Sequence, residues 1–533
     1  MKEYLALPYL LEFRFKIMIF KNTDQKNICI TASIATLLFY FPLILNNYYY
    51  RDDYIRLYTQ TPGWSEYGRP FADVLTLFLS GDWQWLPDSA PFFLLVALFL
   101  TVVSACVSLN IRSIPFNSIT AVLLVAYLFN PFLLSAYLYR YDCVLMAMGL
   151  TCSLLGWAYY PSSKLKSAIF CFVCMGFYQS YINMFIVLIL IETLFKIYNG
   201  GNIGVAIKYL FKAIIFAAII TIIFYFFAKL FILEYATAKS QFIFQSPKGP
   251  WHHIAVTTEN AFSRYFGFLS TTGKILYGIA ICFGFAQIQL HFYRDTHFEK
   301  PVLRATICSI AFLFMLPISL GVIYGIVGDN GIPPRLMPQS IFFSVCIIFL
   351  IIQFITRFQN SRQTIGPLTF ANTKITWGMI VFFLLFPLVF SYILNSAVRI
   401  QNELNRYYLY RLATSLEKYP PEKPAYILGG LGTSIYLKDI LQRMRLLAIT
   451  IPHGSDWLLS SQLKEFGYNN VKKISNTRLA TQLVTELCNQ NRLPDINTMN
   501  YRIFDLGEFL FISLGRKNMC LSYYNENTGD ELQ

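Results

Sequence analysis

Charged side chains are scarce in this sequence, where Asp, Glu, Lys and Arg together make up 14% of 533 residues. Soluble domains carry about a quarter of their residues as charged side chains, so the composition excludes an ordinary soluble domain. Hydrophobic residues make up 56% of the chain, and the mean hydropathy is +0.48. The sequence therefore predicts a polytopic α-helical membrane protein.

Sequence patterns for a disulfide framework, a metal site or a nucleotide loop are also missing. The eleven cysteines show no regular framework, and the CxxC pair Cys171 and Cys174 lies inside an apolar run, where small helix side chains are expected. The stretch Gly429-Gly430-Leu431-Gly432 lacks the full spacing of a dinucleotide-binding fingerprint and indicates a turn. No cleavage site of the A-x-A type precedes the first apolar run, so no cleavable signal peptide is expected. We expect neither a metal nor a cofactor.

Acidic residues are outnumbered, because 29 Asp and Glu stand against 43 Lys and Arg and give a net charge of +14. In membrane proteins, such an excess lies in cytoplasmic loops and contacts anionic lipid. Membrane lipid, and not nucleic acid, is therefore the expected partner of the basic side chains.

Long apolar runs are abundant. A helix needs about 20 mostly apolar residues to cross a bilayer, which predicts about eleven spans: Ile28–Leu45, Ala90–Ile111, Ser118–Leu138, Cys143–Tyr160, Ser167–Tyr178, Tyr181–Tyr198, Tyr209–Leu233, Tyr265–Leu290, Val302–Ile326, Met337–Arg357 and Ile375–Asn395. The short pair that meets near Gln179 is either two spans or one long kinked helix, and the second choice would invert every later loop.

The distribution of Lys and Arg predicts the orientation of these spans. It favours a cytoplasmic amphipathic N-terminus (residues 1–27), a transmembrane domain (residues 28–395) with a large periplasmic loop (residues 46–89), and a periplasmic tail (residues 396–533). Within the loop, Pro70–Leu79 is too short to cross and predicts an interfacial helix with Pro in its first turn.

The tail has a much higher density of charge than the spans and predicts a small α/β domain. The expected helices are Ile400–Glu417, Thr433–Arg445 and Thr477–Asn491, and the expected strands are Ala425–Leu428, Leu446–Ile451 and Phe509–Ser513.

The most informative stretch follows the first predicted span, where Asp52 and Asp53 adjoin Arg51 and precede Arg56 and Arg69. Acidic side chains at a membrane boundary are costly and are usually kept for function. Many aromatic residues surround the pair, and these fit either an interfacial belt or stacking on a sugar. An aromatic belt with solvated charges is the alternative to a functional site.

Three blocks in the first third of the chain carry a resemblance to a known family. They are the double Asp followed by Gly68-Arg69-Pro70, then Asn130-Pro131-Phe132 followed by Tyr139-Arg140-Tyr141-Asp142, then Tyr178-Gln179-Ser180 inside a span. In order and spacing they resemble the serotype-converting O-antigen glucosyltransferases, the type-II Gtr family. The other two thirds of the chain share only the general character of that family.

The resemblance implies a GT-C-type fold in the bacterial inner membrane. It also implies a sugar donor on undecaprenyl phosphate, with glucose as the family default, and an acceptor in O-antigen or lipopolysaccharide. Transfer in the family inverts the anomeric centre without a nucleotide, and the first periplasmic loop carries the catalytic carboxylate. Carried over, either Asp52 or Asp53 is the general base, and Asp53 is preferred because Asp52 adjoins Arg51.

The remaining candidate residues have two interpretations each. Arginine holds a lipid phosphate by charge-assisted hydrogen bonds, which makes Arg56, Arg69, Arg140 and Arg335 candidate phosphate contacts and Asp142 a second acidic candidate. Arg69 is alternatively a residue that only bonds its own loop at a helix entry. Arg140 and Asp142 alternatively form an ion pair that closes a tight loop, and Arg335 alternatively ends a turn shaped by glycine and proline (residues 328–335).

Two other functions compete with sugar transfer. A transporter or flippase of lipid-linked sugars usually has internal repeats and a charged cavity near mid-membrane, and the sequence shows no convincing repeat. An O-antigen polymerase or ligase also has many spans and Arg-rich periplasmic loops. The double Asp directly after the first span favours the transferase.

Overall fold

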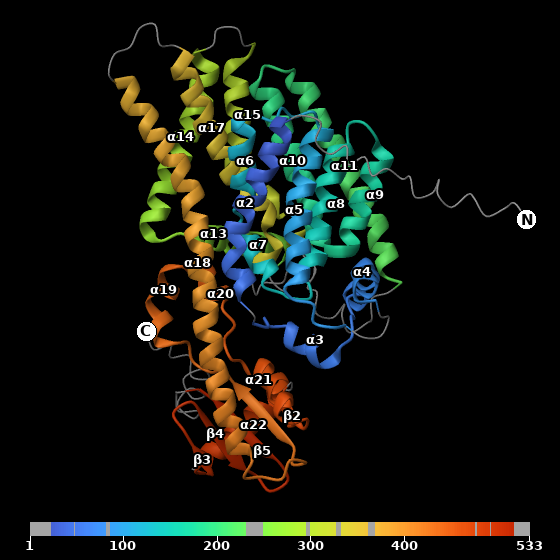
Figure 1. Ribbon diagram of the computed structural model, residues 1–533, viewed down its shortest axis with the longest axis vertical. Helices are drawn as coiled ribbons and strands as arrows, with labels where there is room; N and C mark the ends of the chain where they lie inside the picture. Colours follow the sequence, from blue (N-terminus) through green and yellow to red (C-terminus); the bar gives the residue numbers. More distant parts are fainter. Residues whose placement is uncertain are drawn as a thin grey trace, which may run out of the picture.

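The computed structural model describes residues 23–46, 48–81, 86–230, 249–294, 299–326, 332–360, 368–474, 477–490 and 492–515. Most of the predicted N-terminal segment 1–27 lies outside these ranges, as do residues 82–85 of the predicted loop 46–89, residues 328–331 of the turn before Arg335, and the last part of the tail. The described part is mostly helical, with a bundle of helices at one end and a small sheet at the other (Figure 1).

Within the described ranges, seven helical stretches are long and apolar enough to cross a membrane, or eight if the bent pair α6 (Ser118–Leu128) and α7 (Pro131–Tyr137) is one span. The seven are α2 (Thr23–Leu45), α5 (Phe92–Ile111), α9 with η2 and α10 (Lys164–Tyr178, Gln179–Tyr181, Ile182–Tyr198), α11 (Ile203–Ala228), most of α14 (Thr271–Arg294), α15 (Pro301–Leu320) and part of α18 (Leu368–Leu416). Shorter apolar helices are α4 (Pro70–Ser80), α8 (Cys143–Tyr159) and the stretch Pro338–Gln353 in η6 (Pro338–Ser340) and α17 (Ile341–Asn360). This agrees with a polytopic membrane protein, whereas the number of eleven spans stays a prediction.

The remaining helices of the bundle are short. They are α3 (Asp53–Thr59), η1 (Ser65–Tyr67), α13 (Pro250–Tyr265), η4 (Phe266–Phe268), α16 (Ile323–Ile326) and η5 (Pro334–Leu336). A helix lies where Pro70–Leu79 predicted one, and Pro70 occupies its first turn. There the missing N–H of proline costs no hydrogen bond.

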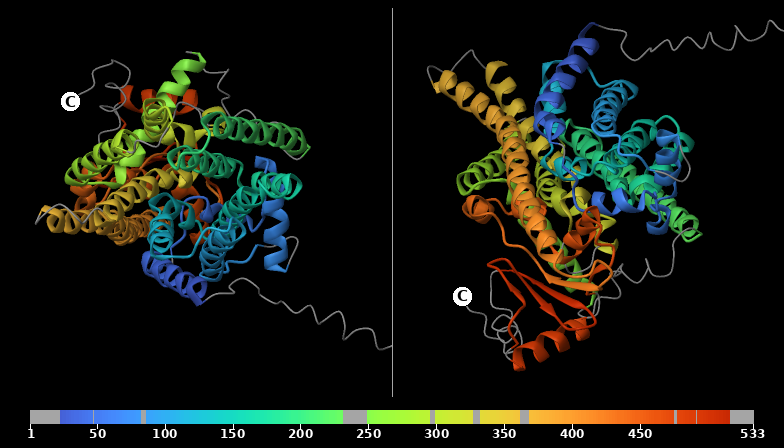
Figure 2. Two further views of the ribbon diagram at one scale, coloured as in Figure 1. Left: turned by 90° about the horizontal axis from the view of Figure 1, so that it is seen from above. Right: turned by 60° about the horizontal axis from the view of Figure 1, so that its bottom comes forward.

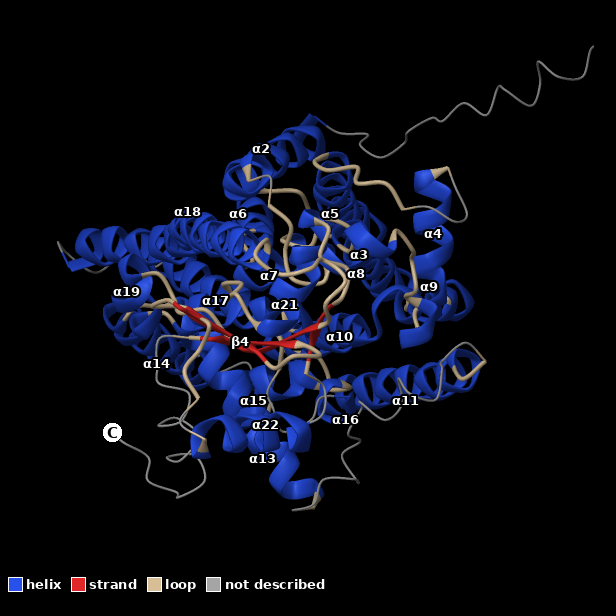
Figure 3. Cartoon of the chain, turned by 90° about the horizontal axis from the view of Figure 1, so that it is seen from below, coloured by secondary structure: helices blue, strands red, loops and turns tan. Residues whose placement is uncertain are grey.

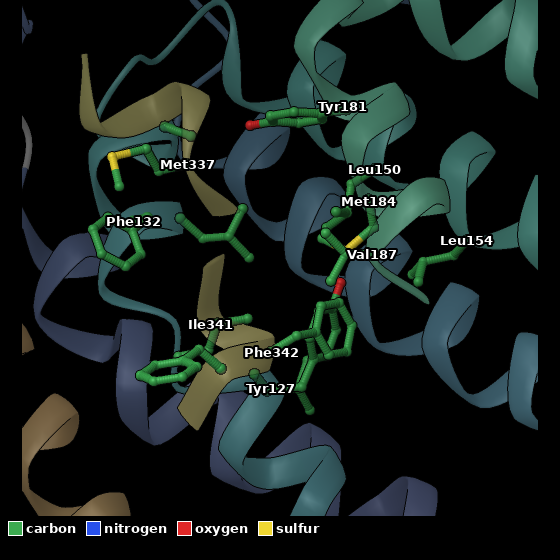
Figure 4. Packing of buried hydrophobic residues seen from close by; sticks show 14 of the residues in the cluster. Tyr127, Phe132, Leu150, Leu154, Tyr181, Met184, Val187, Met337, Ile341 and Phe342 are labelled. Atoms are coloured by element: carbon green, nitrogen blue, oxygen red, sulfur yellow. The ribbon is translucent and has the colours of Figure 1, made fainter. Parts of the chain in front are cut away.

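Aromatic side chains fill much of the bundle interior. Tyr127 stacks on Phe342 with 5.4 Å between ring centroids, and Phe132 stacks on Tyr265 at 5.7 Å; Figure 4 shows three of these rings, those of Tyr127, Phe132 and Phe342. Some buried hydroxyl groups are paired within this core, for example Tyr265 with Tyr277 at 2.6 Å. Between membrane helices such close packing and hydrogen bonding supply the association energy, because lipid tails are as apolar as the side chains.

The tail is built on α18, whose 49 residues run from the bundle into the sheet region without interruption (Figures 1 and 2). The predicted domain boundary at Ser396 therefore falls inside a continuous helix. The sheet has the order β2-β1-β5-β4-β3, with bounds Val471–Lys473, Ala425–Gly429, Leu510–Leu514, Tyr501–Asp505 and Ile496–Asn497. Strand β1 pairs in parallel with β2 and β5, and the β5–β4 and β4–β3 pairs are antiparallel.

Two hydrophobic clusters hold the sheet. One contains Leu409, Leu412 and Leu416 of α18 together with residues of α21 (Asp456–Gln462) and η8 (Leu463–Phe466), and the other contains residues of α22 (Thr477–Asn489). All five residues of β5 are buried. A central strand covered on both faces is expected to be apolar throughout. Strand β5 is apolar except for Ser513.

Two predicted elements of the tail are wrong or only partly right. Leu446–Ile451 is not a strand, because Arg445–Thr450 forms helix α20. The predicted helix Thr433–Arg445 is reduced to η7 (Ile435–Leu437) and α19 (Lys438–Arg443). A short apolar run fits a buried strand or a buried helix equally well by composition, and here packing of α20 against η4 decides in favour of the helix.

The tail and the bundle meet at the end of the bundle where α3 lies. Helix α3 contacts α21, and α20 contacts η4 and α13. Seen from below, the strands cross beneath the centre of the bundle, with α3, α7 and α21 close to its middle (Figure 3). The loop with the double Asp is therefore enclosed between the bundle and the tail.

Candidate active site

Asp53 joins two of the sequence blocks. Its carboxylate accepts hydrogen bonds from the backbone N–H groups of Tyr50 at 2.9 Å, Arg140 at 3.0 Å and Tyr141 at 3.4 Å, and its side chain is fully buried. Burial raises the pKa of Asp53 to about 8, although the N–H donors of Arg140 and Tyr50 act in the opposite direction. Asp53 thus ties the loop after α2 to the loop before α8.

Asp52 has a different environment. It precedes the first residue of α3 and is half-buried, and among the described residues its carboxylate has no hydrogen-bond or ion-pair partner. Arg51, which precedes it, has a φ of 47°, a left-handed conformation that is costly for a residue with a Cβ. The Arg51 guanidinium donates to the carbonyl of Ile449 at 2.6 Å. Arg51 is therefore bonded to the tail, which leaves the neighbouring Asp52 carboxylate available.

Arg56 and Asp142 form an ion pair inside the site. Their Nε and Oδ1 atoms are 3.2 Å apart, and the indole N–H of the buried Trp64 donates to the same Oδ1 at 3.0 Å. The Arg56 guanidinium also lies 3.7 Å from the centre of the Trp64 ring. Asp73 fixes this segment further, because its carboxylate accepts from the N–H groups of Trp64 and Ser65. Asp142 and Arg56 are therefore committed to each other and to Trp64.

Arg140 does not pair with Asp142. Its guanidinium lies 2.7 Å from Asp88 Oδ2 and 4.4 Å from the centre of the Tyr49 ring, and the Tyr49 hydroxyl donates to the same Asp88 oxygen at 2.8 Å. The alternative interpretation of an Arg140–Asp142 pair that closes the loop is wrong. Both residues instead join the loop 139–142 to different parts of the loop after α2.

Arg69 lies against the Tyr178-Gln179-Ser180 block. Its guanidinium is 4.4 Å from the centre of the Tyr178 ring, an attractive cation–π geometry, and its Nε has no hydrogen-bond partner in the described part of the chain. The amide of Gln179 donates to the carbonyls of Gly68 at 2.7 Å and Tyr67 at 3.2 Å. Gln179 therefore positions the Gly68-Arg69 segment, and the Arg69 Nε–H group has no acceptor among the described residues.

Arg335 approaches from the other half of the bundle. It lies over the Tyr139 ring with 4.7 Å to the ring centre, and its carbonyl accepts from the Tyr181 hydroxyl. Burial lowers the pKa of Arg335, the Asp52 carboxylate raises it, and the nearby Arg69 lowers it. Arg335 therefore lies within electrostatic range of both Asp52 and Arg69.

The Asn130-Pro131-Phe132 block has a structural role. The Asn130 side chain accepts from the N–H of Phe132 and so caps α7, which is bent by 48° against α6. The same side chain donates to the carbonyl of Pro338 at 2.8 Å, close to Arg335 in sequence. Asn130 therefore fixes the bend and holds the segment that carries Arg335.

The tail also contributes contacts to the site. The hydroxyl of Tyr50 donates to the carbonyl of Thr450 at 2.6 Å, next to the Arg51–Ile449 bond. A small cavity of about 200 Å³ adjoins this region and is lined by Asn46, Tyr48, Tyr49, Arg140 and Asn402, among others. The side-chain nitrogen of the buried Asn402 has no partner within the described ranges. This lining combines tyrosine rings with the amide groups of Asn46 and Asn402.

Four further residues organise the site. The sequence does not single out Asp73 or Asp88, and it places Trp64 and Tyr50 only among the aromatic residues that surround the double Asp. Each acts through a partner far away in sequence or through a backbone group, so no local spacing points to it. All seven predicted site residues lie near the same end of the bundle, but the structure commits Asp53, Arg56, Arg140 and Asp142 to internal bonds. Asp52, Arg69 and Arg335 remain as the groups that can meet a ligand.

Comparison with known proteins agrees with the arrangement of these blocks. A protein of Salmonella phage P22, described as an uncharacterized 55.3 kDa protein in the gtrB 5′ region, is 26% identical over 179 residues. This match covers 32% of the present chain and 36% of the phage protein, so the chain spans about a third of that relative. The family model described as glucosyl transferase GtrII matches residues 41–352, more than half of the chain and all the sequence blocks discussed above. The resemblance drawn from these blocks is confirmed, and the chain belongs to the glucosyl transferase GtrII family.

Proposed function

We propose that the protein is a membrane glycosyltransferase that moves glucose from undecaprenyl phosphate to O-antigen or lipopolysaccharide at the periplasmic surface of the bacterial inner membrane. The observation that supports this most directly is the Asp52 carboxylate, which has no hydrogen-bond or ion-pair partner among the described residues and lies within electrostatic range of Arg335, as Arg69 does. Its setting contrasts with that of Asp53, whose oxygens already accept three backbone N–H groups.

We assign the general base to Asp52, which reverses the preference drawn from the sequence. A general base must reach the proton that it removes, and a fully buried carboxylate that bridges two loops cannot do so without breaking them. The reason for preferring Asp53 was that Arg51 would hold Asp52. The Arg51 guanidinium instead bonds to Ile449.

The proposed reaction is a single inverting displacement. Asp52 takes the proton of an acceptor hydroxyl, whose oxygen forms a bond to the anomeric carbon. The bond from that carbon to the phosphate oxygen breaks, and undecaprenyl phosphate leaves with the electron pair. Arg69 and Arg335 stabilise the charge that develops on the phosphate, since arginine offers planar, charge-assisted donors. This chemistry requires neither a metal nor a nucleotide.

We further propose eleven crossings with the site on the periplasmic side. This proposal is supported by which helix ends lie together at each end of the bundle. The start of α15 meets the end of α10 through Arg304, which donates to the carbonyls of Ile197 and Gly201, whereas the other end of α10 begins beside Gln179 and the site. The break at Tyr178, where the backbone is extended, favours α9 and α10 as two crossings. Cys488 in the tail is disulfide-bonded, which fits an oxidising compartment such as the periplasm.

The test is a transfer assay with purified protein in lipid, glucose-labelled undecaprenyl phosphate and lipopolysaccharide. Asp52→Asn should lower turnover by about 10²–10⁴-fold, the usual contribution of a general base, with nearly unchanged donor binding. Asp439→Asn, an identical exchange at an exposed position of α19, is the matched control and should retain activity. Wild-type-like turnover by Asp52→Asn would refute its role as base, and absence of transfer by the wild-type protein would refute the reaction.

A further inference from the structure

A cavity lies away from the carboxylates, between α5, α6, α8, α10 and α17. It has a volume of about 620 Å³, within the range of small-molecule and lipid sites. Leucine, isoleucine and phenylalanine side chains form most of its wall. At one end it reaches Arg112, Glu192 and Lys196, which lie at the ends of α5 and α10 opposite to the site.

Three buried polar atoms line this apolar space without a hydrogen-bond partner among the described residues. They are the hydroxyl oxygens of Ser108 and Tyr127 and the indole nitrogen of Trp157, whose residues are 1%, 4% and 7% exposed. In Figure 4 the Tyr127 hydroxyl points toward Val187 of α10, among hydrophobic side chains. A buried donor without an acceptor is rare in native proteins and calls for a specific explanation.

The end of the cavity carries a net positive charge. Glu192 bonds both Arg112 and Lys196, with 2.8 Å to the lysine, so two cations share one carboxylate. The Arg112 guanidinium lies 5.1 Å from the centre of the Trp157 ring, and Arg112 follows Ser108 by one helical turn. The donors of Arg112, Ser108 and Trp157 therefore lie close together. Lys196 is 46% exposed and lines the cavity at this end. Basic pockets between membrane helices are typical binding places for anionic lipid headgroups.

We propose that this cavity binds one anionic glycerophospholipid of the leaflet opposite to the carboxylate site. An acyl chain lies along the apolar wall, and the phosphate lies at Arg112 and Lys196. The phosphate, glycerol and ester oxygens are the acceptors that Ser108, Tyr127 and Trp157 lack among the described residues. The sugar donor is not the occupant, because its phosphate bond must break beside Asp52 and Arg335, which lie at the other end of the bundle.

The binding is tested by native mass spectrometry of the full-length protein with phosphatidylglycerol and phosphatidylcholine of equal chain length. The wild-type protein should retain one phosphatidylglycerol in preference to phosphatidylcholine. Lys196→Gln should reduce this preference about fivefold, as expected for one basic residue near an anionic headgroup. Lys166→Gln, an exposed lysine that does not line the cavity, is the matched control and should leave the preference unchanged.

A second variant tests where the acyl chain of the lipid lies. Leu124→Trp fills the cavity and should abolish retention, whereas Phe99→Trp on the exposed face of α5 should not. A photoreactive acyl chain should label peptides of α5, α6 and α17. Equal retention of both phospholipids by the wild-type protein, or retention of undecaprenyl phosphate with exclusion of phosphatidylglycerol, would overturn the proposal. If Leu124→Trp does not fold, the charge variants and the labelling still decide it.

Discussion

At the scale of single residues, the two adjacent aspartates have opposite environments. Asp53 is fully buried and saturated with backbone donors, while the Asp52 carboxylate is half-buried and unpaired within the described chain. Two neighbouring side chains at the start of a helix point in different directions, because residues three or four apart share a face and adjacent residues do not. This difference in direction separates a bridging carboxylate from one that can meet a substrate.

The burial of Asp53 predicts how the free energy of unfolding depends on pH. The pKa of Asp53 is about 8 in the folded protein and near 3.8 in the unfolded chain, so the folded state binds more protons between these values. The free energy of unfolding should therefore fall as the pH rises from about 4 to 8, by at most about 1.4 kcal/mol per pH unit. Asp53→Asn removes this titration and should flatten the profile of melting temperature against pH. Parallel profiles for the two proteins would contradict the assignment.

Arg69 makes a second prediction at this scale. Its guanidinium stacks on Tyr178 and keeps Nε without a partner in the described structure. Lysine carries the same charge but cannot stack in this way or offer two parallel donors to a phosphate. Arg69→Lys should weaken binding of undecaprenyl-phosphate-glucose by about tenfold, more than Asp52→Asn does, in a direct binding titration. Arg399→Lys, on the exposed face of α18, is the control, and equal affinities for both variants would argue against phosphate contact by Arg69.

At the scale of elements, α20 is the unexpected part of the site. The carbonyls of its last two residues accept hydrogen bonds from Tyr50 and Arg51, which precede Asp52 directly. A helix leaves its last carbonyls without partners inside the helix, so the C-terminal end of α20 is a natural acceptor for donors from the loop. The tail therefore holds the loop that carries the proposed base.

Removal of one of these bonds should loosen α20. Tyr50→Phe deletes the donor to Thr450 and keeps the ring, at a net cost of about 1 kcal/mol. Hydrogen exchange of residues 445–450 should then become about fivefold faster, and turnover should fall without loss of donor binding. Tyr436→Phe, at an exposed position outside the site, serves as control. Unchanged exchange in Tyr50→Phe would show that α20 is held by other contacts.

At the scale of the whole molecule, one continuous helix joins the parts. Helix α18 begins in the bundle and ends against the sheet, so the tail lies on the same side as α3 and the carboxylates (Figure 1). If the bundle crosses the membrane, the sheet and the proposed active site must share one compartment. The orientation of the entire protein can therefore be measured at its C-terminus.

A reporter that is active only in the periplasm should be active when fused after Gln533 and silent when inserted after Lys164. The reason is that Lys164 begins α9 at the end of the bundle opposite to Tyr178 and the site. Protease access to the tail in intact and in lysed spheroplasts provides an independent check. An inactive C-terminal fusion would place the site in the cytoplasm and would contradict transfer from a periplasmic donor.

The sequence by itself determined the membrane character and the family, and it predicted the location of the site. Low charge and long apolar runs require a bilayer, because such a chain has too little polar surface for water. The acidic pair after the first span and the three blocks were visible because their residues lie close together in the chain. Strands β1 and β5 and helices α4 and α22 followed from local patterns of apolar residues.

Only the tertiary structure decided which of these residues are free to act. The pairing of Arg140 with Asp88 and of Arg56 with Asp142 joins segments that local spacing does not connect, and the bonds from Tyr50 and Arg51 to α20 span about 400 residues. Leu446–Ile451 became a helix because of what it packs against and not because of its composition. A carboxylate acts as a bridge or as a base according to the donors around it, and those donors are brought together only when the distant segments fold.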